Sequence, residues 1–371
     1  MKTGLVLEGG GAKGAFHCGA IKALYDNGYA FDGAVGTSIG AINAALVVQD
    51  GCYESLMETW THIAPSMFTD FDDIEVEKLY NKELNRDTVA YWTKQVLKII
   101  KNLGIPTEKF LEFLKLHISE EKVRLSKMDL GLVTYSLSDR EPVELFLEDI
   151  PYGKLHNYLL ASAYYPAFRL KRLDGKFFID GGVYNNMPIS LLSEKGYDKV
   201  IAIRTMSKMP YITPVMPSVD VSFICPSEDL GRTMQMSAKM MNRNIKLGYY
   251  DALRFLKDYA GKRYYIDSSV EDLIGFFCAG LEKSGMSKEE VLKEIAELYP
   301  DCETDDAIVT FLEEYAYLCG IEKFYIYKPE EFLHALKERA ENVEIIKGRL
   351  KRIILREKAK KDKLFLDVTR S

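Results

Sequence analysis

The sequence lacks the patterns that usually build metal sites, disulfide frameworks and membrane spans. Its six cysteines include no C-x-x-C pair, and its five histidines show neither an H-E-x-x-H nor an H-x-H spacing. These absences argue against a zinc site and favour reduced cysteines in a core. The sequence has no run of about 20 apolar residues and no apolar stretch near its start that resembles a signal peptide. We therefore expect a cytoplasmic protein without a metal ion.

An excess of basic residues is also missing. The net charge is −6, from 49 Lys and Arg against 55 Asp and Glu. This balance argues against general nucleic-acid binding. Apolar residues make up 47% and charged residues 28% of the 371, which is ordinary for a globular protein. A chain of this length can form a large core and a second lobe.

The first fifty residues carry the strongest local pattern. A strand is expected at 3–8, a glycine-rich turn at 9–14, a helix at 15–27, a strand at 31–35, a sharp turn at 36–40 and a helix at 41–49. This order predicts a βαβα unit with both turns at the same edge of a parallel sheet.

The second turn, Gly36-Thr37-Ser38-Ile39-Gly40, has the G-x-S-x-G form of a nucleophile elbow. In such an elbow the serine hydroxyl projects at the N-terminus of the following helix, where partial positive charge favours an oxyanion. A chance match is the alternative, since the motif is short. Its position between a strand and a helix favours Ser38 as a nucleophile.

The glycine-rich turn, Gly9 to Gly14, has more than one interpretation. It matches the dinucleotide fingerprint G-x-G-x-x-G, with Asp26 and Asp32 as candidate ribose ligands, but Asp32 falls at the wrong end of its strand. Gly14 follows Lys13 where a Walker A loop needs Ser or Thr. We favour an oxyanion loop that supports the elbow serine. Its expected backbone donors are Gly9, Gly10, Gly11 and Ile39, with Lys13 and Gly14 as loop support. Lys13 as a solvated surface charge is the alternative.

His17 follows this loop closely, but it shares its helix with apolar residues and is expected to be a packed histidine rather than a base. From 53 to about 120 the pattern is helical, with an acidic loop at 70–73. The apolar faces of this insert are candidates for an acyl-binding groove or for plain core.

A second carboxylate position lies further along the chain. Strands are expected at 130–137 and 143–147, a helix at 155–163, and a short buried strand at 177–179 that ends in Asp180-Gly181-Gly182. A carboxylate at the tip of an apolar strand is costly unless it has partners. Alone, Asp-Gly-Gly is typical of a turn. Together with Ser38, it favours Asp180 as a catalytic group.

Taken in order, the glycine loop 9–14, the Ser38 elbow, the block Ala161-Ser162-Ala163-Tyr164-Tyr165-Pro166 and the Asp180 motif resemble the patatin-like phospholipase family over residues 3–205. The resemblance implies a three-layer α/β fold, with a mostly parallel central sheet and helices on both faces. It also implies a Ser38–Asp180 dyad without a catalytic histidine. Lys13 stands where the family usually carries Arg, which supplies a rigid fork of donors.

We therefore predict a serine lipid acyl hydrolase of the phospholipase A type, acting on acyl esters of phospholipids or related lipids without a cofactor. An α/β-hydrolase is disfavoured because its triad needs a late histidine, and only His334 is available, in a helical region. The non-enzymatic alternative is a nucleotide- or lipid-binding module that uses the glycine loop.

The expected catalytic domain covers residues 1–208, and residues 209–371 form a mainly helical extension. In the extension we expect a last sheet strand at 221–225, a methionine-rich helix at 229–258 that is either core or a lipid groove, and a final helix at 329–355. Residues 347–363 are basic and partly apolar, so they form either a solvated helix end, which is favoured, or a peripheral contact with anionic membranes. The oligomeric state is left open.

Overall fold

The structure is a computed structural model, which describes residues 1–209, 219–283 and 287–339. The chain divides into two compact units, Met1–Leu253 and Arg254–Ser371. The predicted boundary after residue 208 concerns the extent of the catalytic domain and stays a prediction. The predicted basic segment 347–363 and the end of the predicted helix 329–355 lie outside the described residues.

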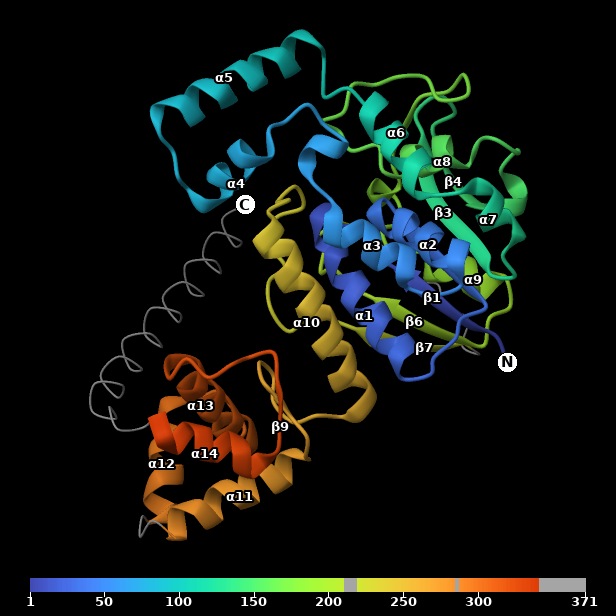
Figure 1. The fold of residues 1–371 in the computed structure, drawn as a ribbon. Helices are drawn as coiled ribbons and strands as arrows, with labels where there is room; N and C mark the ends of the chain where they lie inside the picture. Colours follow the sequence, from blue (N-terminus) through green and yellow to red (C-terminus); the bar gives the residue numbers. More distant parts are fainter. Residues whose placement is uncertain (210–218, 284–286, 340–371) are drawn as a thin grey trace. The chain divides into compact units, whose positions relative to one another are not determined.

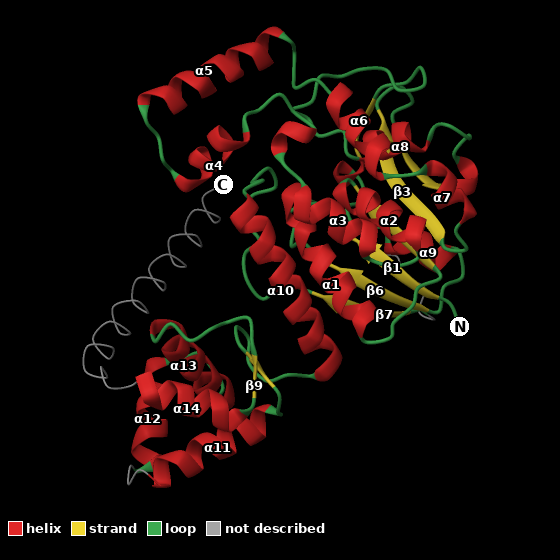
Figure 2. Cartoon of the chain, viewed as in Figure 1, coloured by secondary structure: helices red, strands yellow, loops and turns green. Residues whose placement is uncertain are grey.

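The first unit is built on one mostly parallel sheet (Figures 1 and 2). Its path is β4-β3-β2-β1-β6-β7, and β5 pairs with β3 off this path. Only β4 and β5 run antiparallel, both against β3. The predicted fold class is therefore confirmed. The strands are β1 (Thr3–Leu7), β2 (Gly33–Thr37), β3 (Asp129–Ser136), β4 (Glu141–Phe146), β5 (Phe178–Asp180), β6 (Lys199–Ile203) and β7 (Asp220–Ile224).

Helices cover both faces of this sheet because its strands are apolar on both sides. On one face, Val6 and Val35 pack into a cluster with Ile189 and Leu192 of helix α9 (Ile189–Glu194). Successive side chains of a strand point to opposite faces. Leu5 and Leu7 therefore face the other side, where α2 (Ile39–Asp50) lies against β1, β2 and β3. Helix α1 (Ala15–Asp26) links β1 to β2 and confirms the predicted βαβα unit.

The position of β5 matters for the site. One edge of β3 is occupied by β4 along residues 131–136, so β2 and β5 share the other edge. Thr37 is the last residue of β2 paired with β3, opposite Val133, and Asp180 of β5 pairs with the next residue, Thr134. Because β5 is antiparallel to β3, the carboxyl ends of β2 and β5 meet.

The segment predicted as a helical insert consists of several short elements. They are α3 (Glu54–His62), η2 (Pro65–Met67), α4 (Asp73–Asn81), α5 (Arg86–Lys101), α6 (Glu108–His117) and α7 (Glu120–Leu125). Asp72 in the acidic loop caps α4, since its carboxylate accepts the N–H of Glu75 at 3.0 Å. Helix α8 (Leu155–Ser162) leads toward β5, and the short turns η1 (Gly11–Gly14), η3 (Leu147–Asp149) and η4 (Gly181–Val183) complete this part.

The helix predicted over 229–258 is wrong in its first third. Helix α10 spans Ala238–Lys257, and the preceding residues form a loop. Gly231 has a left-handed φ of 84°, and the carbonyl of Thr233 accepts the N–H of Ala12 at 2.7 Å. This tertiary contact with the glycine loop outweighs the local helical pattern.

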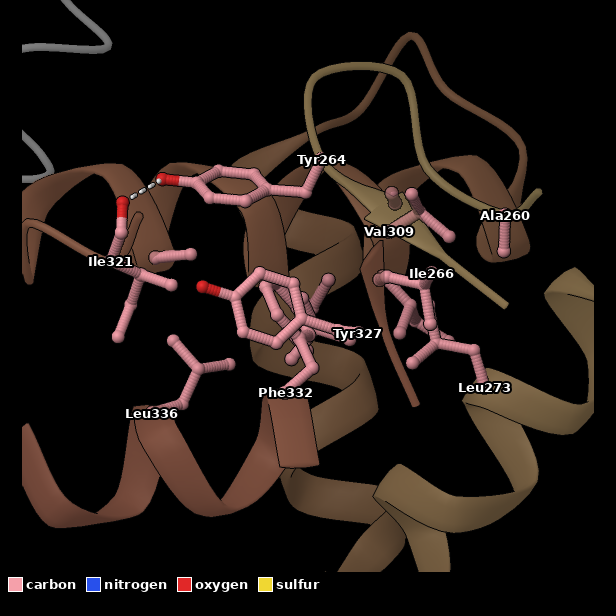
Figure 3. Packing of buried hydrophobic residues seen from close by; sticks show 14 residues of the cluster. Ala260, Tyr264, Ile266, Leu273, Val309, Ile321, Tyr327, Phe332 and Leu336 are labelled. Atoms are coloured by element: carbon pink, nitrogen blue, oxygen red, sulfur yellow. Dashed lines mark hydrogen bonds between the residues drawn. The ribbon is translucent and has the colours of Figure 1, made fainter. Parts of the chain in front are cut away.

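The second unit has a separate hydrophobic core. Helices α11 (Val270–Lys283), α12 (Lys288–Leu298), α13 (Thr304–Leu318) and α14 (Pro329–Arg339) surround it, with a small sheet of β8 (Tyr265–Ile266) and β9 (Ile326–Tyr327). Figure 3 shows Tyr264, Tyr327 and Phe332 packed at its centre. Glu313 is 5% exposed and accepts the N–H groups of residues 262–264 at 2.7–2.8 Å.

Across the described ranges, no helix is both long enough and apolar enough to span a bilayer.

Candidate active site

Ser38 lies on a strained turn between β2 and α2. Its φ of 57° and ψ of −126° are unusual for a residue with a side chain. The turn closes because the two motif glycines have no Cβ. A Cβ at Gly36 would lie 2.3 Å from the backbone carbon of Gly40, and one at Gly40 would lie 2.1 Å from the carbonyl oxygen of Leu7. The motif therefore has the geometry of a nucleophile elbow.

The hydroxyl of Ser38 donates a hydrogen bond to Oδ2 of Asp180 at 2.6 Å. Oδ1 of Asp180 accepts the N–H of Gly182 at 2.8 Å, which fixes the carboxylate plane. Gly181 allows the close turn, since a Cβ there would lie 2.2 Å from the carbonyl oxygen of Val133. The structure thus brings together the two side chains that the sequence predicted as a pair.

Burial changes the acid–base behaviour of Asp180. The residue is 8% exposed, and desolvation of the charged form raises its pKa from 3.8 to about 6. The hydrogen bonds from Ser38 and from the N–H of Gly182 oppose this rise because they stabilise the carboxylate. None of the five histidines, all within the described ranges, hydrogen-bonds to Ser38 or Asp180.

Ser162 supports the elbow, a role that the sequence reasoning missed. Its hydroxyl accepts the backbone N–H of Ser38 at 2.9 Å and donates to the carbonyl of Val133 at 2.6 Å. The N–H of Ser38 is therefore occupied. The available signal was the position of Ser162 in the Ala161–Pro166 block, which was used only as part of a resemblance.

The glycine loop lies beside the elbow. Fewer of its backbone N–H groups are free to hold an oxyanion than the sequence predicted. The N–H of Gly9 donates to the carbonyl of Asn186 at 3.0 Å, so Gly9 does not fit the predicted role of oxyanion donor. Within the described part of the chain, the N–H groups of Gly10 and Gly11 have no acceptor. The N–H of Ile39 is the first of helix α2 and has no intrahelical partner.

Two further residues missed by the sequence reasoning hold the loop. Glu8 is fully buried and accepts the N–H groups of Thr205, Met206 and Ser207 at 2.7–3.2 Å. The side chain of Asn186 donates to the carbonyl of Gly9 at 3.2 Å. Glu8 is a carboxylate at the tip of an apolar strand before glycines, the same signal that pointed to Asp180.

The remaining loop residues differ in their surroundings. Gly14 is buried, and a Cβ there would lie 2.7 Å from Ile39. Lys13 is half-buried and has no carboxylate partner among the residues that the structure describes. His17 is fully buried and its pKa falls to about 3 because of desolvation, which confirms a packed histidine.

The two aspartates that a nucleotide site would need as ribose ligands do not lie beside the glycine loop. Asp32 accepts the N–H of Thr3 at 2.7 Å, at the amino end of β1, whereas the glycine loop follows the carboxyl end. A five-residue strand separates these ends by about 15 Å. Asp26 pairs with Lys22 at 2.6 Å.

Ser38 and Asp180 open into a cavity of about 720 Å³. Its walls are largely apolar and come from the helical insert, the segment before β5, the residues after β6, the loop before α10 and the first turn of α10. They include Trp60, Ile63, Pro65, Phe68, Phe110, Phe113, Phe168, Met206, Met234, Met236 and Met241. Residues of the insert and of the methionine-rich segment, for which core and groove were both open, thus line this cavity.

The fold and this geometry define a class of α/β protein that carries a serine–aspartate pair at the carboxyl edge of a parallel sheet. A family model described as "Patatin-like phospholipase" matches residues 5–193. The chain therefore belongs to the patatin-like phospholipase family.

Similar proteins include two long curated relatives. "Neuropathy target esterase sws" of Drosophila melanogaster is 29% identical over 206 residues, which are 54% of this chain and 12% of that protein. "Patatin-like phospholipase domain-containing protein 6" of Homo sapiens is 27% identical over 205 residues, 54% of this chain and 13% of that protein. The chain thus matches about an eighth of their length. The crystal structure of VipD from Legionella pneumophila aligns with a TM-score of 0.42 and 16% identity, covering 92% of this chain and 87% of that chain.

Proposed function

We propose that the protein is a lipid acyl hydrolase in which Ser38 is the nucleophile and Asp180 the general base. The observation that carries this proposal is the 2.6 Å hydrogen bond from the Ser38 hydroxyl to Asp180 inside an apolar cavity. Membership of the patatin-like phospholipase family supports lipid as the substrate. A carboxylate with a pKa of about 6 is a stronger base than an ordinary Asp and is still deprotonated at neutral pH.

In the first half-reaction, Asp180 accepts the Ser38 proton while Oγ forms a bond to the ester carbonyl carbon. The carbonyl oxygen becomes an oxyanion, which the N–H groups of Gly10, Gly11 and Ile39 are proposed to hold. Collapse of this intermediate breaks the bond to the alcohol oxygen. The leaving alcohol takes the proton from Asp180, and the acyl group stays on Ser38.

In the second half-reaction a water molecule replaces the alcohol. Asp180 accepts one proton from this water as its oxygen attacks the acyl carbon, and the same backbone donors hold the second oxyanion. Release of the fatty acid breaks the bond to Ser38, whose oxygen regains the proton from Asp180. The cycle consumes one ester and one water, and needs no oxidant or reductant.

We further propose that the acyl ester belongs to a lipid with an anionic headgroup. Lys13, Lys208 and Arg232 line the same cavity as Ser38. None of these three side chains has a carboxylate partner among the described residues. Cations placed beside an apolar cavity match a phosphate attached to acyl chains.

The test compares the wild type with Ser38→Ala and Asp180→Asn. Labelling by a fluorophosphonate probe reports the nucleophile, and hydrolysis of a short nitrophenyl ester and of a long-chain phospholipid reports turnover. We expect both variants to lose turnover by at least about a thousandfold, and Ser38→Ala to lose labelling. Ser193→Ala is the matched control, because this buried serine donates to Ser190 outside the cavity.

A binding module without catalysis predicts a different result. It would leave the wild type inert to the probe and to both esters. Loss of turnover in Ser38→Ala but not in Asp180→Asn would remove Asp180 from the role of base.

A further inference from the structure

Helix α5 has a broad apolar face, and only part of it is covered by the rest of the described chain. On the covered part, Trp92 packs against Phe71 with ring centroids 5.3 Å apart and donates to the carbonyl of Glu75 at 3.2 Å. This contact fixes α5 to α4 and to the loop before it. Figure 1 shows the α4–α5 pair outside the layer of helices that covers the sheet.

The uncovered part of this face presents a row of exposed aliphatic side chains. They are Val89 (52% exposed), Val96 (50%), Leu97 (62%), Ile100 (65%) and, just after the helix, Leu103 (84%). Their spacing of seven, eight, eleven and fourteen residues from Val89 places them on one face of a helix with 3.6 residues per turn. A contiguous exposed row of this kind indicates an interaction surface.

Basic residues border the aliphatic row. Helix α5 contains Arg86, Lys94, Lys98 and Lys101 but only one acidic residue, Asp87. Lys98 pairs with Asp70 at 2.9 Å, whereas Lys94 and Lys101 are exposed and have no carboxylate partner in the described ranges. They are seven residues apart, so they lie in line beside Leu97. An aliphatic face bordered by lysines complements an anionic lipid surface.

The α4–α5 pair is joined to the cavity wall by the chain segments on both sides of it and by one hydrogen bond. The chain enters it from Pro65 and Phe68 and leaves it toward Phe110 and Phe113, and all four residues line the cavity. The hydroxyl of Tyr80 in α4 donates to the carbonyl of Met234, in the loop before α10 that also lines the cavity. Binding of α5 to an external surface would therefore also bring the residues that line the cavity close to that surface.

We propose that the exposed face of α5 docks on the surface of an anionic lipid bilayer. The aliphatic row inserts among the lipid headgroups, and Lys94 and Lys101 contact anionic headgroups at its border. The docking surface is separate from Ser38 and Asp180, and it gives the proposed hydrolase direct access to lipids in a membrane. Only this last consequence rests on the proposed function.

The test measures vesicle binding without turnover. The full chain carrying Ser38→Ala is sedimented with vesicles of phosphatidylcholine alone or with 30% phosphatidylserine. We expect binding to the anionic vesicles that decreases with salt. Leu97→Glu with Ile100→Glu should weaken this binding by at least about tenfold, and Lys94→Gln with Lys101→Gln by about tenfold with a smaller salt dependence.

The control is Leu125→Glu, which places one glutamate at a 77% exposed leucine of α7. It should bind vesicles like the parent. In the background with Ser38 intact, the α5 variants should hydrolyse a soluble short-chain ester at the wild-type rate, which shows that they are folded.

Three results would overturn the proposal. Unchanged binding of the Leu97→Glu/Ile100→Glu variant is the first. The second is vesicle binding that is lost only when residues 347–371 are deleted. The third is a wild type that binds no vesicles but forms an oligomer in sedimentation velocity, which the α5 substitutions dissociate. A second copy of the chain would then cover the exposed face of α5. A wild type inert to the fluorophosphonate probe would remove the proposed function and leave the binding result standing.

Discussion

Asp180 is a carboxylate that burial makes more basic. If Asp180 is the general base, its pKa of about 6 predicts that the deprotonated, reactive form decreases below this pH. About nine-tenths of the molecules carry the charged form at pH 7 and about one-tenth at pH 5. We expect kcat/KM for a soluble ester to fall with unit slope below about pH 6. An acidic limb near pH 4, the value for an ordinary Asp, would show that Asp180 is not the base.

The same pKa has a consequence for stability. Because the folded-state pKa lies above the ordinary 3.8, this carboxyl group contributes stability that is present in full below pH 3.8 and is lost as the pH rises through 6. At pH 8 the buried charge costs about 3 kcal/mol of unfolding free energy. Asp180→Asn should therefore be more stable than wild type at pH 8, by up to about 3 kcal/mol, and nearly equal to it at pH 4.

Urea denaturation of both proteins at the two pH values measures this difference. Ser193→Ala, examined in parallel, should show no such dependence on pH. A less stable Asp180→Asn at pH 8 would mean that the hydrogen bonds from Ser38 and Gly182 outweigh the desolvation of the carboxylate.

Lys13 is the third residue with a testable role. If it contacts an anionic headgroup, Lys13→Ala should raise KM for an anionic phospholipid about threefold to tenfold and leave a neutral soluble ester unchanged. Lys13→Arg, which restores the residue usual in the family, should retain the phospholipid KM. An equal loss on both substrates would instead indicate that Lys13 supports the loop.

Residues of the site that lie in short sequence motifs could be predicted, whereas residues that act through long-range contacts could not. Ser38, Asp180 and the glycines carry their signal in short motifs, because a tight turn accepts few residue types. Ser162 stood in a short block that indicated only a resemblance, and Asn186 stood in no motif. The roles of both arise from contacts with Ser38 and Gly9, which are 124 and 177 residues away. The hydrogen bond from the N–H of Gly9 to Asn186 could not be predicted for the same reason.

At the scale of elements, the elbow depends on how closely α2 approaches β1. A Cβ at Gly40 would lie 2.1 Å from the carbonyl oxygen of Leu7, and backbone of a central strand cannot move aside cheaply. We expect Gly40→Ala to lose at least about 2 kcal/mol of stability and most fluorophosphonate labelling. Gly51→Ala, at the other end of α2, is the control.

Gly51 has a φ of 69° and open space around it. An alanine there strains only its own backbone, so Gly51→Ala should cost about 1 kcal/mol and keep full labelling. Equal losses of labelling in the two variants would show that helix stability, rather than the approach to β1, controls the elbow.

Most elements of the first unit could be predicted because glycine-rich turns separate apolar runs of distinct period. The observed strands and helices differ from the expected ranges mainly at their ends. Helix α9 was not predicted, and residues 229–237, where a methionine-rich pattern predicted a helix, form a loop. There the backbone of Thr233 pairs with Ala12, a contact that no local pattern contains.

At the scale of the whole molecule, the first unit continues past the predicted boundary at residue 208. Strand β7 pairs with β6 through five residue pairs. Helix α10 lies against α1 so closely that a Cβ at Gly19 would lie 1.8 Å from the carbonyl oxygen of Ile245, and one at Gly248 would lie 2.0 Å from that of Phe16. The sequence signal was weak here, because two isolated glycines within helices do not show what they pack against.

These contacts predict how much of the chain the first unit needs in order to fold. The core of the second unit consists of residues 260–336, so a chain ending at Asp258 removes that core as a whole and keeps β7 and α10. We expect it to fold and to react with the fluorophosphonate probe at nearly the rate of the full chain. A chain ending at Lys208 should be insoluble or inert, because it exposes the edge of β6 and the face of α1. Full reactivity of the shorter chain would support the predicted boundary at 208. Failure of the longer one would make the second unit necessary for the fold of the first.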